Sequence, residues 1–250
     1  MGKRLTVMAA VLSAMPPVSP ALAQDRLPPG FVFLRDVDPS IAQDMRYASS
    51  NNFTGRSLPG YGAPECVLRR DAALALKRVQ DSLTPRHLSL KVYDCYRPQR
   101  AVQAMARWAA APEDDKTRRF YPGREKRTLF SGWIAMHSMH SAGVAVDLTI
   151  VPLGSAAPPF DAAARYGACS GPKTQRAPDN SLDMGTSFDC FSVRSYTRSA
   201  AISPGERERR GILVAAMTRQ GFTNYFREWW HYQYAGGAAP HAYDIPIPPR

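Results

Sequence analysis

The sequence has no apolar run long enough to cross a membrane. The stretch from Leu5 to Met15 is well short of the ~20 apolar residues that a spanning helix needs, and no later segment is apolar enough. The sequence also has no internal repeat, no C-x-x-C pair and no H-E-x-x-H motif. These absences argue against an integral membrane protein, a repeat protein, a thiolate metal site and a metalloprotease with both histidines on one helix.

The first residues have the pattern of a secretory signal peptide. Two basic residues precede the apolar stretch, prolines end it, and residues 21–23 (Ala-Leu-Ala) form the small-x-small pattern that signal peptidase cleaves. We therefore expect residues 1–23 to be a signal peptide and residues 24–250 to form the mature domain. Because no cysteine lies near the cleavage site, we expect no lipid or other membrane anchor. The protein is predicted to be exported, either periplasmic or extracellular.

The chain is basic, but its positive charge is dispersed. The formal net charge is +11, or +9 without the two basic residues of the expected signal peptide (11 − 2). The densest basic group, Arg207 to Arg210, is interleaved with Glu206 and Glu208, which is typical of a solvated helix face. We therefore expect no nucleic-acid partner. A hydrophobic content of 44% and the length fit one globular domain.

The cysteines are few and even in number: Cys66, Cys95, Cys169 and Cys190. In an exported chain an even count favours disulfides, and four cysteines allow three pairings. The first two flank an expected helix–strand unit, whereas the last two bracket one long loop. We therefore expect the pairs Cys66–Cys95 and Cys169–Cys190.

The periodicity of apolar residues predicts a mixture of strands and helices. Alternating or β-rich segments predict strands at residues 31–34, 88–93, 143–151 and 229–234. Helices are predicted at residues 71–83, at 99–109, and from a capping box at 203–206 to near 221. A segment rich in Gly, Pro and Ser, residues 152–200, reads as a long insertion. Because there is no strict βαβ rhythm, we expect a single α+β domain with a largely antiparallel sheet and flanking helices.

Two short segments combine imidazoles with carboxylates. They are S-M-H-S-A-G-V-A-V-D at residues 138–147 and E-W-W-H at residues 228–231. A catalytic zinc commonly has three His, Asp or Glu ligands and one position open for water. His140, Asp147 and His231 supply such a set, which leaves Glu228 as a general base. The alternative is that these are ordinary core or surface residues, as we expect for the remaining histidines: His87, His137 and His241.

Strand geometry adds a constraint on this site. Side chains alternate between the two faces of a strand, so a regular strand would place His140 and Asp147 on opposite faces. A turn at residues 141–143 would remove this conflict, since Gly143 can adopt the backbone that it needs. Glu228 and His231 are three positions apart, so we expect a bend or bulge near Trp229.

The two segments resemble the VanX-type D-alanyl-D-alanine dipeptidases. The pattern is S-x-H-x-x-G-x-A-x-D, followed far downstream by E-W-W-H-Y. The resemblance runs from about Phe31 to Tyr243, and other segments match that family in the same order: Asn52–Gly55, Asp94–Val102, Met184–Asp189 and Gly221–Phe222. This family belongs to a superfamily of zinc peptidases that includes peptidoglycan D,D- and L,D-carboxypeptidases and, by fold, the hedgehog signalling domain.

The resemblance implies a role for each matching residue. His140, Asp147 and His231 match the ligands of one Zn²⁺ per chain. Glu228 matches the general base, and Arg97 matches the arginine that stabilises the transition state. The remaining matches are substrate-binding positions: Ser138 and Asp189 for the free ammonium, and Tyr47, Tyr61 and Trp229 for the pocket walls.

The activity implied is hydrolysis of the dipeptide D-Ala-D-Ala to two D-alanines by a zinc-activated water. The nearest alternative is a peptidoglycan D,D- or L,D-carboxypeptidase, and the other is a non-catalytic zinc-binding protein of the cell envelope. The segment that ends at Asp189 favours a dipeptidase over a carboxypeptidase, because it carries the expected ammonium site. Retention of Glu228 and Arg97 beside the three ligands favours an enzyme over the non-catalytic alternative. For an exported enzyme, salvage of D-Ala-D-Ala during wall turnover is a more natural physiological role than glycopeptide resistance.

Overall fold

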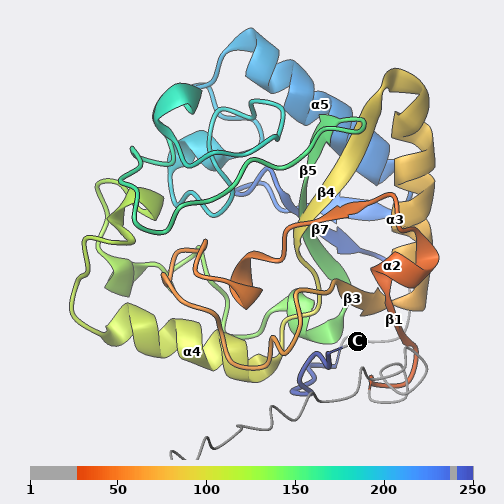
Figure 1. Ribbon diagram of the computed structural model, residues 1–250, viewed down its shortest axis with the longest axis horizontal. Coiled ribbons are helices and arrows are strands. Elements are labelled where there is room, and N and C mark those ends of the chain that lie inside the picture. The colour runs from red at the N-terminus through yellow and green to blue at the C-terminus, as the bar shows by residue number, and fades with distance from the viewer. Residues whose placement is uncertain (1–26, 237–240, 250) are drawn as a thin grey trace, which may run out of the picture.

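The computed structural model describes residues 27–236 and 241–249 (Figure 1). The expected signal peptide, residues 1–23, lies outside the described residues. The strands are β1 (Phe31–Phe33), β2 (Ala42–Gln43), β3 (Val67–Arg69), β4 (Leu88–Asp94), β5 (Ala145–Pro152), β6 (Phe222–Asn224) and β7 (His231–Tyr234). The α-helices are α2 (Leu34–Val37), α3 (Arg70–Leu83), α4 (Gln99–Ala110) and α5 (Pro204–Thr218).

A five-stranded sheet in the order β2-β4-β5-β7-β6 forms the centre of the molecule, and β1 and β3 form a separate antiparallel pair. Within the five-stranded sheet only β2 and β4 are parallel, while the other neighbours run antiparallel. The expected α+β domain with a largely antiparallel sheet is therefore confirmed. None of the helices in the described part of the chain is both long and apolar enough to cross a membrane.

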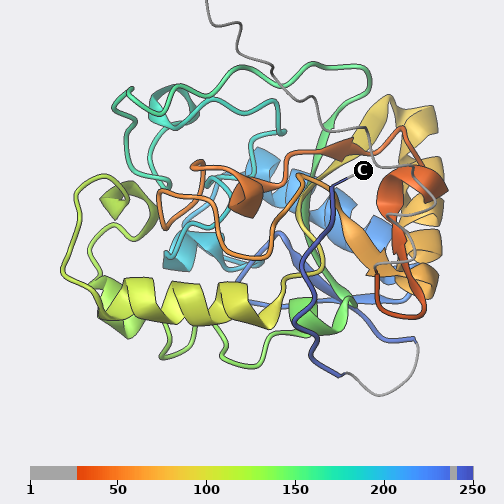
Figure 2. The same cartoon turned by 60° about the horizontal axis from the view of Figure 1, so that its bottom comes forward.

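The central strands β4 and β5 are buried along almost their whole length. In Figure 1, α3 lies on one side of the sheet, where it contacts both β4 and α5. In Figure 2, α4 (yellow-green) and the insertion (teal) lie on the other side, and the segment after β2 (orange) runs between them. Cover on both faces explains why the sequence of β5 is continuously apolar except at two positions, Asp147 and Thr149.

Several expected strand boundaries were wrong, among them the start of the strand expected at 143–151, which begins only at Ala145. The first predicted strand, 31–34, ends one residue early because Leu34 begins the short helix α2. The last, 229–234, begins only at His231, because the N–H of His231 donates to the carbonyl of Glu228 (3.2 Å) and closes a turn. Trp229 and Trp230 are β-prone aromatic residues, but the turn hydrogen bond and burial of both rings decide their backbone.

Both expected disulfides are present. Cys66 is bonded to Cys95, which directly follows β4, and Cys169 is bonded to Cys190 within the insertion. All four cysteines are buried. Each bond therefore fastens a loop from inside the molecule.

The insertion is held on the sheet by an ionic cluster centred on Asp179. The ammonium of Lys91, which is buried in β4, lies 2.7 Å from one oxygen of Asp179. The hydroxyl of Tyr93 and the guanidinium of Arg46 contact the other oxygen. The insertion has little regular structure of its own apart from 3₁₀ turns at Lys173–Gln175 and Val193–Ser195. The ion pairs of Asp179 with buried side chains nevertheless fix its position.

Candidate metal centre and active site

A 3₁₀ turn places His140 beside Asp147. The turn, η5, covers Met139–Ala142, and the hydroxyl of Ser138 caps it by accepting from the N–H of His140 (3.3 Å). Gly143 ends the turn with φ +71°, a left-handed backbone that residues with a Cβ rarely adopt. β5 then begins at Ala145, so His140 and Asp147 reach the same side of the sheet, as the expected turn requires.

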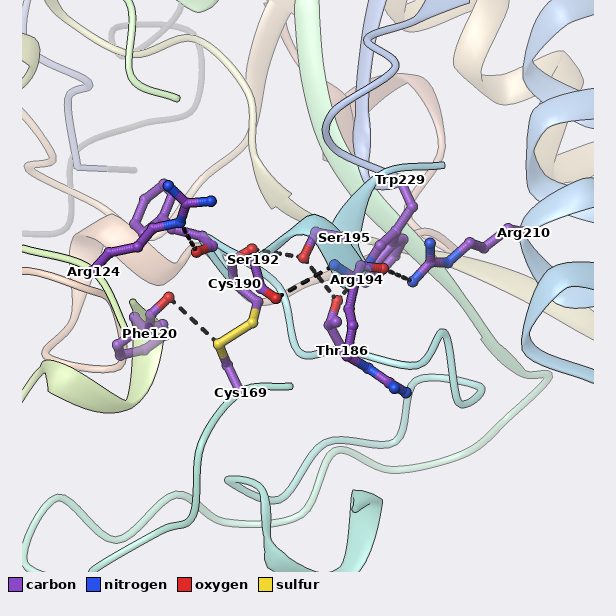
Figure 3. Close-up of a disulfide and its surroundings, with 11 residues drawn as sticks. Phe120, Arg124, Cys169, Thr186, Cys190, Ser192, Arg194, Ser195, Arg210 and Trp229 are labelled. Carbon is purple, nitrogen blue, oxygen red and sulfur yellow. Dashed lines mark hydrogen bonds between the residues drawn. A yellow bond between two sulfur atoms is a disulfide. The ribbon is translucent and has the colours of Figure 1, made fainter. Parts of the chain in front are cut away.

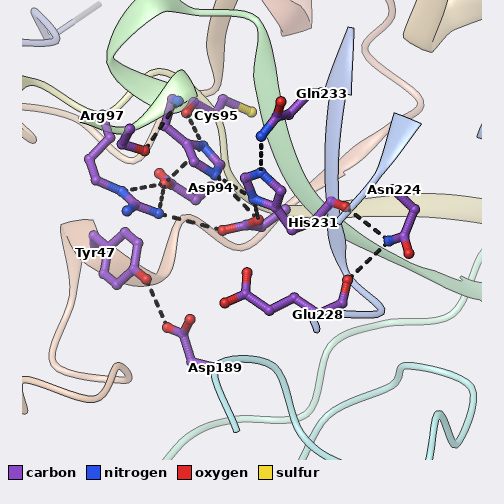
Figure 4. A network of polar contacts seen from close by, with 12 residues as sticks. Tyr47, Asp94, Cys95, Arg97, Asp189, Asn224, Glu228, His231 and Gln233 are labelled. Atoms are coloured by element: carbon purple, nitrogen blue, oxygen red, sulfur yellow. Dashed lines mark hydrogen bonds and ion pairs between the residues drawn. The ribbon is translucent and has the colours of Figure 1, made fainter. Parts of the chain in front are cut away.

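A second turn brings Glu228 and His231 to the same place. The amide of Asn224 holds this turn by donating to the carbonyls of both Glu228 and His231, each at 3.0 Å (Figure 4). Asp147 and His231 are directly opposite each other in the β5–β7 pairing. The expected bend near Trp229 is therefore present as a turn ahead of β7.

The three expected ligands form a compact donor set. Nδ1 of His231 lies 2.9 Å from a carboxylate oxygen of Asp147 and 3.1 Å from Nε2 of His140. The same oxygen of Asp147 lies 3.3 Å from Nε2 of His140. A tetrahedral Zn²⁺ with bonds of about 2.0–2.1 Å separates its donor atoms by roughly 3.3 Å, so these spacings fit such an ion. All three residues are buried, and two imidazoles with one carboxylate form a donor set typical of catalytic zinc.

The local charges suit a cation at this point. Burial would raise the pKa of Asp147, but the two imidazoles outweigh it and hold that pKa well below its ordinary value. Burial lowers the pKa of His231, which keeps its imidazole neutral. An ionised carboxylate and a neutral imidazole are the forms that bind a metal.

Arg97 stands next to these ligands and is itself rigidly held. Its guanidinium contacts one oxygen of Asp94 twice, at 2.9 Å and 2.8 Å, and reaches Asp147 at 3.5 Å. The hydroxyl of Tyr61 donates to the other oxygen of Asp94 (2.6 Å). The guanidinium also lies over the ring of Tyr47, 4.9 Å from its centroid. Arg97 therefore presents its charge in one fixed direction.

Asp189 lies across the site from Arg97. One of its carboxylate oxygens accepts a hydrogen bond from the hydroxyl of Tyr47 (2.9 Å), and its backbone is left-handed with φ +57° (Figure 4). Burial raises the pKa of Asp189 well above its ordinary value, and the nearby carboxylate of Asp147 adds to this effect. A buried carboxylate of this kind is a suitable partner for a cationic group of a ligand.

The side chain of Glu228 points into the space between Tyr47 and His231 (Figure 4). It is buried, and burial raises its pKa well above the ordinary value, with further contributions from Asp147 and Asp189. A carboxylate beside a metal donor set, with a raised pKa, has the properties of a general base.

These residues surround one cavity of about 390 Å³. All three donors line it, as do Arg97, Ser138, Asp189, Glu228 and Tyr47. Two expected wall residues lie elsewhere. The hydroxyl of Tyr61 donates to Asp94, the carboxylate that also holds Arg97. The buried indole N–H of Trp229 donates to the hydroxyl of Thr186 (2.8 Å).

The structure also adds residues that the sequence reasoning missed. His137, expected to be an ordinary residue, is exposed and lines the cavity, whose aromatic walls include Phe53, Trp133 and Phe191. Gln233 contacts His231 from β7 (3.2 Å). Asp94 belongs to the matching segment D-C-Y-R-P. Its position three residues before Arg97 was the sequence signal that could have identified it as the partner of that arginine.

A buried His-Asp-His donor set, a rigid arginine and a carboxylate with a raised pKa, on an α+β scaffold, define the class of metal-dependent hydrolases. The D-Ala-D-Ala dipeptidase family model matches residues 28–158 and 174–248. The chain belongs to this family, which is a family of peptidases. The unmatched stretch between the two ranges lies within the insertion.

Individual relatives agree with this assignment. The chain is 32% identical over 216 residues to a D-alanyl-D-alanine dipeptidase of Enterococcus faecalis, an alignment covering 86% of this chain and 96% of the relative. It is 32% identical to a D-alanyl-D-alanine dipeptidase of Streptomyces coelicolor, with 87% and 98% covered. A D-alanyl-D-alanine dipeptidase of Escherichia coli is 29% identical, with 81% and 83% covered.

Proposed function

We propose that this protein is a zinc D-alanyl-D-alanine dipeptidase. The observation that carries the proposal is the donor set of His140, Asp147 and His231 inside a cavity that also contains Glu228, Arg97 and Asp189. Membership of the family and the names of the relatives give the substrate class. One Zn²⁺ bound to the three donors would lower the pKa of a bound water towards ~7 and polarise the peptide carbonyl.

Glu228 acts as the general base in this proposal. Its raised pKa suits it to accept a proton from the attacking water and then to donate that proton to the leaving amine. Arg97 points its guanidinium towards the same cavity and stabilises the negative charge that develops on the carbonyl oxygen. Its two contacts with Asp94 keep it oriented, so little reorganisation is needed during the reaction.

Asp189 binds the free amino group of the dipeptide in this proposal. Its carboxylate, oriented by Tyr47, pairs with the substrate ammonium, and the hydroxyl of Ser138 accepts a further hydrogen bond. An acylated amine carries no charge and would leave Asp189 buried without a cation, which disfavours longer peptides.

We further infer that the enzyme acts outside the cytoplasm. The signal-peptide pattern of residues 1–23 supports this location, and two buried disulfides are typical of oxidising compartments. In that setting the enzyme would act on D-Ala-D-Ala released from the cell wall.

A panel of substrates tests the proposal directly. Release of D-alanine is measured from D-Ala-D-Ala, from L-containing dipeptides and from an N-acylated stem peptide, with and without a chelator. We expect D-Ala-D-Ala to be hydrolysed fastest, and chelation to stop the reaction. Faster cleavage of the acylated stem peptide would instead identify a carboxypeptidase.

The Glu228→Ala variant separates the base from the metal site. We expect kcat for D-Ala-D-Ala to fall by about 10²–10⁴-fold, because proton transfer loses its acceptor. Bound zinc, measured by metal analysis after gel filtration, should stay at one per chain, because Glu228 is not a proposed ligand. Activity close to that of the wild type would remove Glu228 from the mechanism.

A further inference from the structure

We propose that the two disulfides position different halves of the active site: Cys66–Cys95 positions the metal ligand His140, and Cys169–Cys190 positions the ammonium-binding Asp189. The inference rests on the proposed function, because it assigns supporting parts to that metal and that ammonium site. It starts from the neighbours of each disulfide.

The first disulfide lies directly behind the metal site. The backbone carbonyl of Cys95 is 2.7 Å from Nδ1 of His140, and the carbonyl of His140 in turn accepts from the N–H of Arg97 (Figure 4). Cys66 is held at its other side by the side chain of Gln43 (2.7 Å) and the N–H of Leu34 (2.9 Å). The bond therefore ties the carbonyl behind His140 to a fixed part of the fold.

This carbonyl, together with a carboxylate oxygen of Asp94 that lies 3.3 Å from the same Nδ1, sets which nitrogen of His140 can bind a metal. A carbonyl only accepts, so the proton of a neutral His140 must lie on Nδ1, which leaves Nε2 free on the side of Asp147. His231 has the reverse arrangement, because its Nδ1 faces Asp147 and its Nε2 faces the amide of Gln233. When Nδ1 of His231 binds a metal, its proton lies on Nε2, where the amide oxygen of Gln233 can accept it after a flip.

The second disulfide directly adjoins Asp189 in the chain, and Figure 3 shows its surroundings. Cys190 follows Asp189 directly, and Cys169 receives the N–H of Ser187 on its carbonyl (2.9 Å). The loop is further fixed to residues 119–120, because the N–H of Cys169 donates to the carbonyl of Arg119 and the N–H of Phe191 to that of Phe120. These contacts hold the left-handed backbone of Asp189 in place.

The two bonds are thus matched controls for each other. Both are buried, both close loops of similar length (sequence separations of 29 and 21), and each borders a different functional group. A general loosening of the fold would affect metal and substrate binding together. Separate positioning predicts that the two effects divide between the two bonds.

The experiment compares Cys66→Ala/Cys95→Ala with Cys169→Ala/Cys190→Ala in the full mature chain. Zinc Kd is measured by competition with a chromophoric chelator, and KM for D-Ala-D-Ala is measured at saturating zinc. We expect the first pair to weaken zinc binding by about 10–100-fold, because the backbone carbonyl that orients His140 stays in the chain but is no longer held in place, while KM changes little. The second pair should raise KM by about tenfold, with zinc affinity unchanged.

Equal shifts of zinc Kd in both variants, or none in the first, would overturn the proposal. A wild-type chain that binds no zinc would instead refute the proposed function. If either variant lacks the native circular dichroism spectrum, the zinc-loaded wild type provides the decisive measurement. Nitrogen-15 NMR of its histidines should show one ligand protonated on Nδ1 and the other on Nε2. A His140 protonated on Nε2 would exclude the contact between its Nδ1 and the Cys95 carbonyl.

Discussion

Asp189 and Glu228 place two carboxylates on the wall of one small cavity. Among the residues that the structure describes, neither has a hydrogen bond to a basic side chain, and Asp189 has only the hydroxyl of Tyr47. Burial raises the pKa of both groups, so each would be stabilised by a nearby positive charge or by taking up a proton. The proposed roles differ because Glu228 is next to the candidate metal donors and Asp189 is across the cavity from them.

The Asp189→Ala variant tests this division at the level of one residue. We expect kcat/KM for D-Ala-D-Ala to fall by about 10–100-fold, the value of a charged hydrogen bond, and kcat/KM for N-acetyl-D-Ala-D-Ala to change far less. Asp183→Asn is the matched control, since Asp183 lies on the same segment but pairs with Arg176. Equal losses for both substrates would remove the ammonium role.

The residues of the candidate metal site could be anticipated from the sequence, but their supporting contacts could not. The spacing of His140 and Asp147 required a turn, and the turn is there. Tyr61, expected at a pocket wall, instead holds Asp94, because its ring enters from a loop whose course no periodicity predicts. Side-chain direction in loops depends on packing between distant segments, which a single sequence does not reveal.

At the level of elements, the turn before β5 depends on one glycine. Gly143 packs against the ring of Phe31 so closely that a Cβ there would lie 2.1 Å from a ring carbon. The packing of β1 and the position of His140 therefore depend on the same small residue. The sequence predicted the turn, but the approach of β1 to it is a long-range contact.

The Gly143→Ala variant should lose more than about 2 kcal/mol of unfolding free energy, because the left-handed backbone and the clash add. It should also bind zinc more weakly, since His140 moves with the turn. Gly154→Ala is the control: its φ is +76°, and nothing lies within 4 Å of the added Cβ. Urea unfolding of both variants measures their unfolding free energies. Equal losses in the two variants would mean that the ring of Phe31 moves away from the added Cβ at no cost in stability.

At the scale of the whole molecule, the insertion is joined to the sheet by charge rather than by apolar packing alone. Asp179 accepts from Lys91, Tyr93 and Arg46, all of them buried. Burial would raise the pKa of Asp179, but these cations outweigh it and lower that pKa below its ordinary value. The composition of residues 152–200 predicted a loop, but nothing local indicated which sheet residue it would pair with.

The Asp179→Asn variant should be less stable than the wild type by about 3 kcal/mol at pH 7, because it leaves buried cations unpaired. A carboxylate whose folded pKa is lowered adds stability above its unfolded pKa of about 3.9, and this stability is lost as pH falls through the folded pKa. The difference between the two proteins should therefore shrink below about pH 4. Urea unfolding between pH 3 and pH 7 checks this. The control is Asp81→Asn, which removes the exposed ion pair between Lys77 and Asp81 and should change stability little at any of these pH values. A difference that is constant with pH would contradict the assignment.

The cavity carries a sign of charge opposite to that of the protein around it. Among the described residues, Asp147, Asp189 and Glu228 line it beside one guanidinium, that of Arg97, which is already paired with Asp94, in a chain whose formal net charge is +11. The outer positive field extends only about 10 Å at 0.1 M salt, whereas charges inside the cavity are screened much less. A molecule with this charge distribution would attract an anionic surface at long range and favour cations in its cavity at short range. Salt should therefore weaken its adhesion to such a surface well before it weakens capture of an ammonium group.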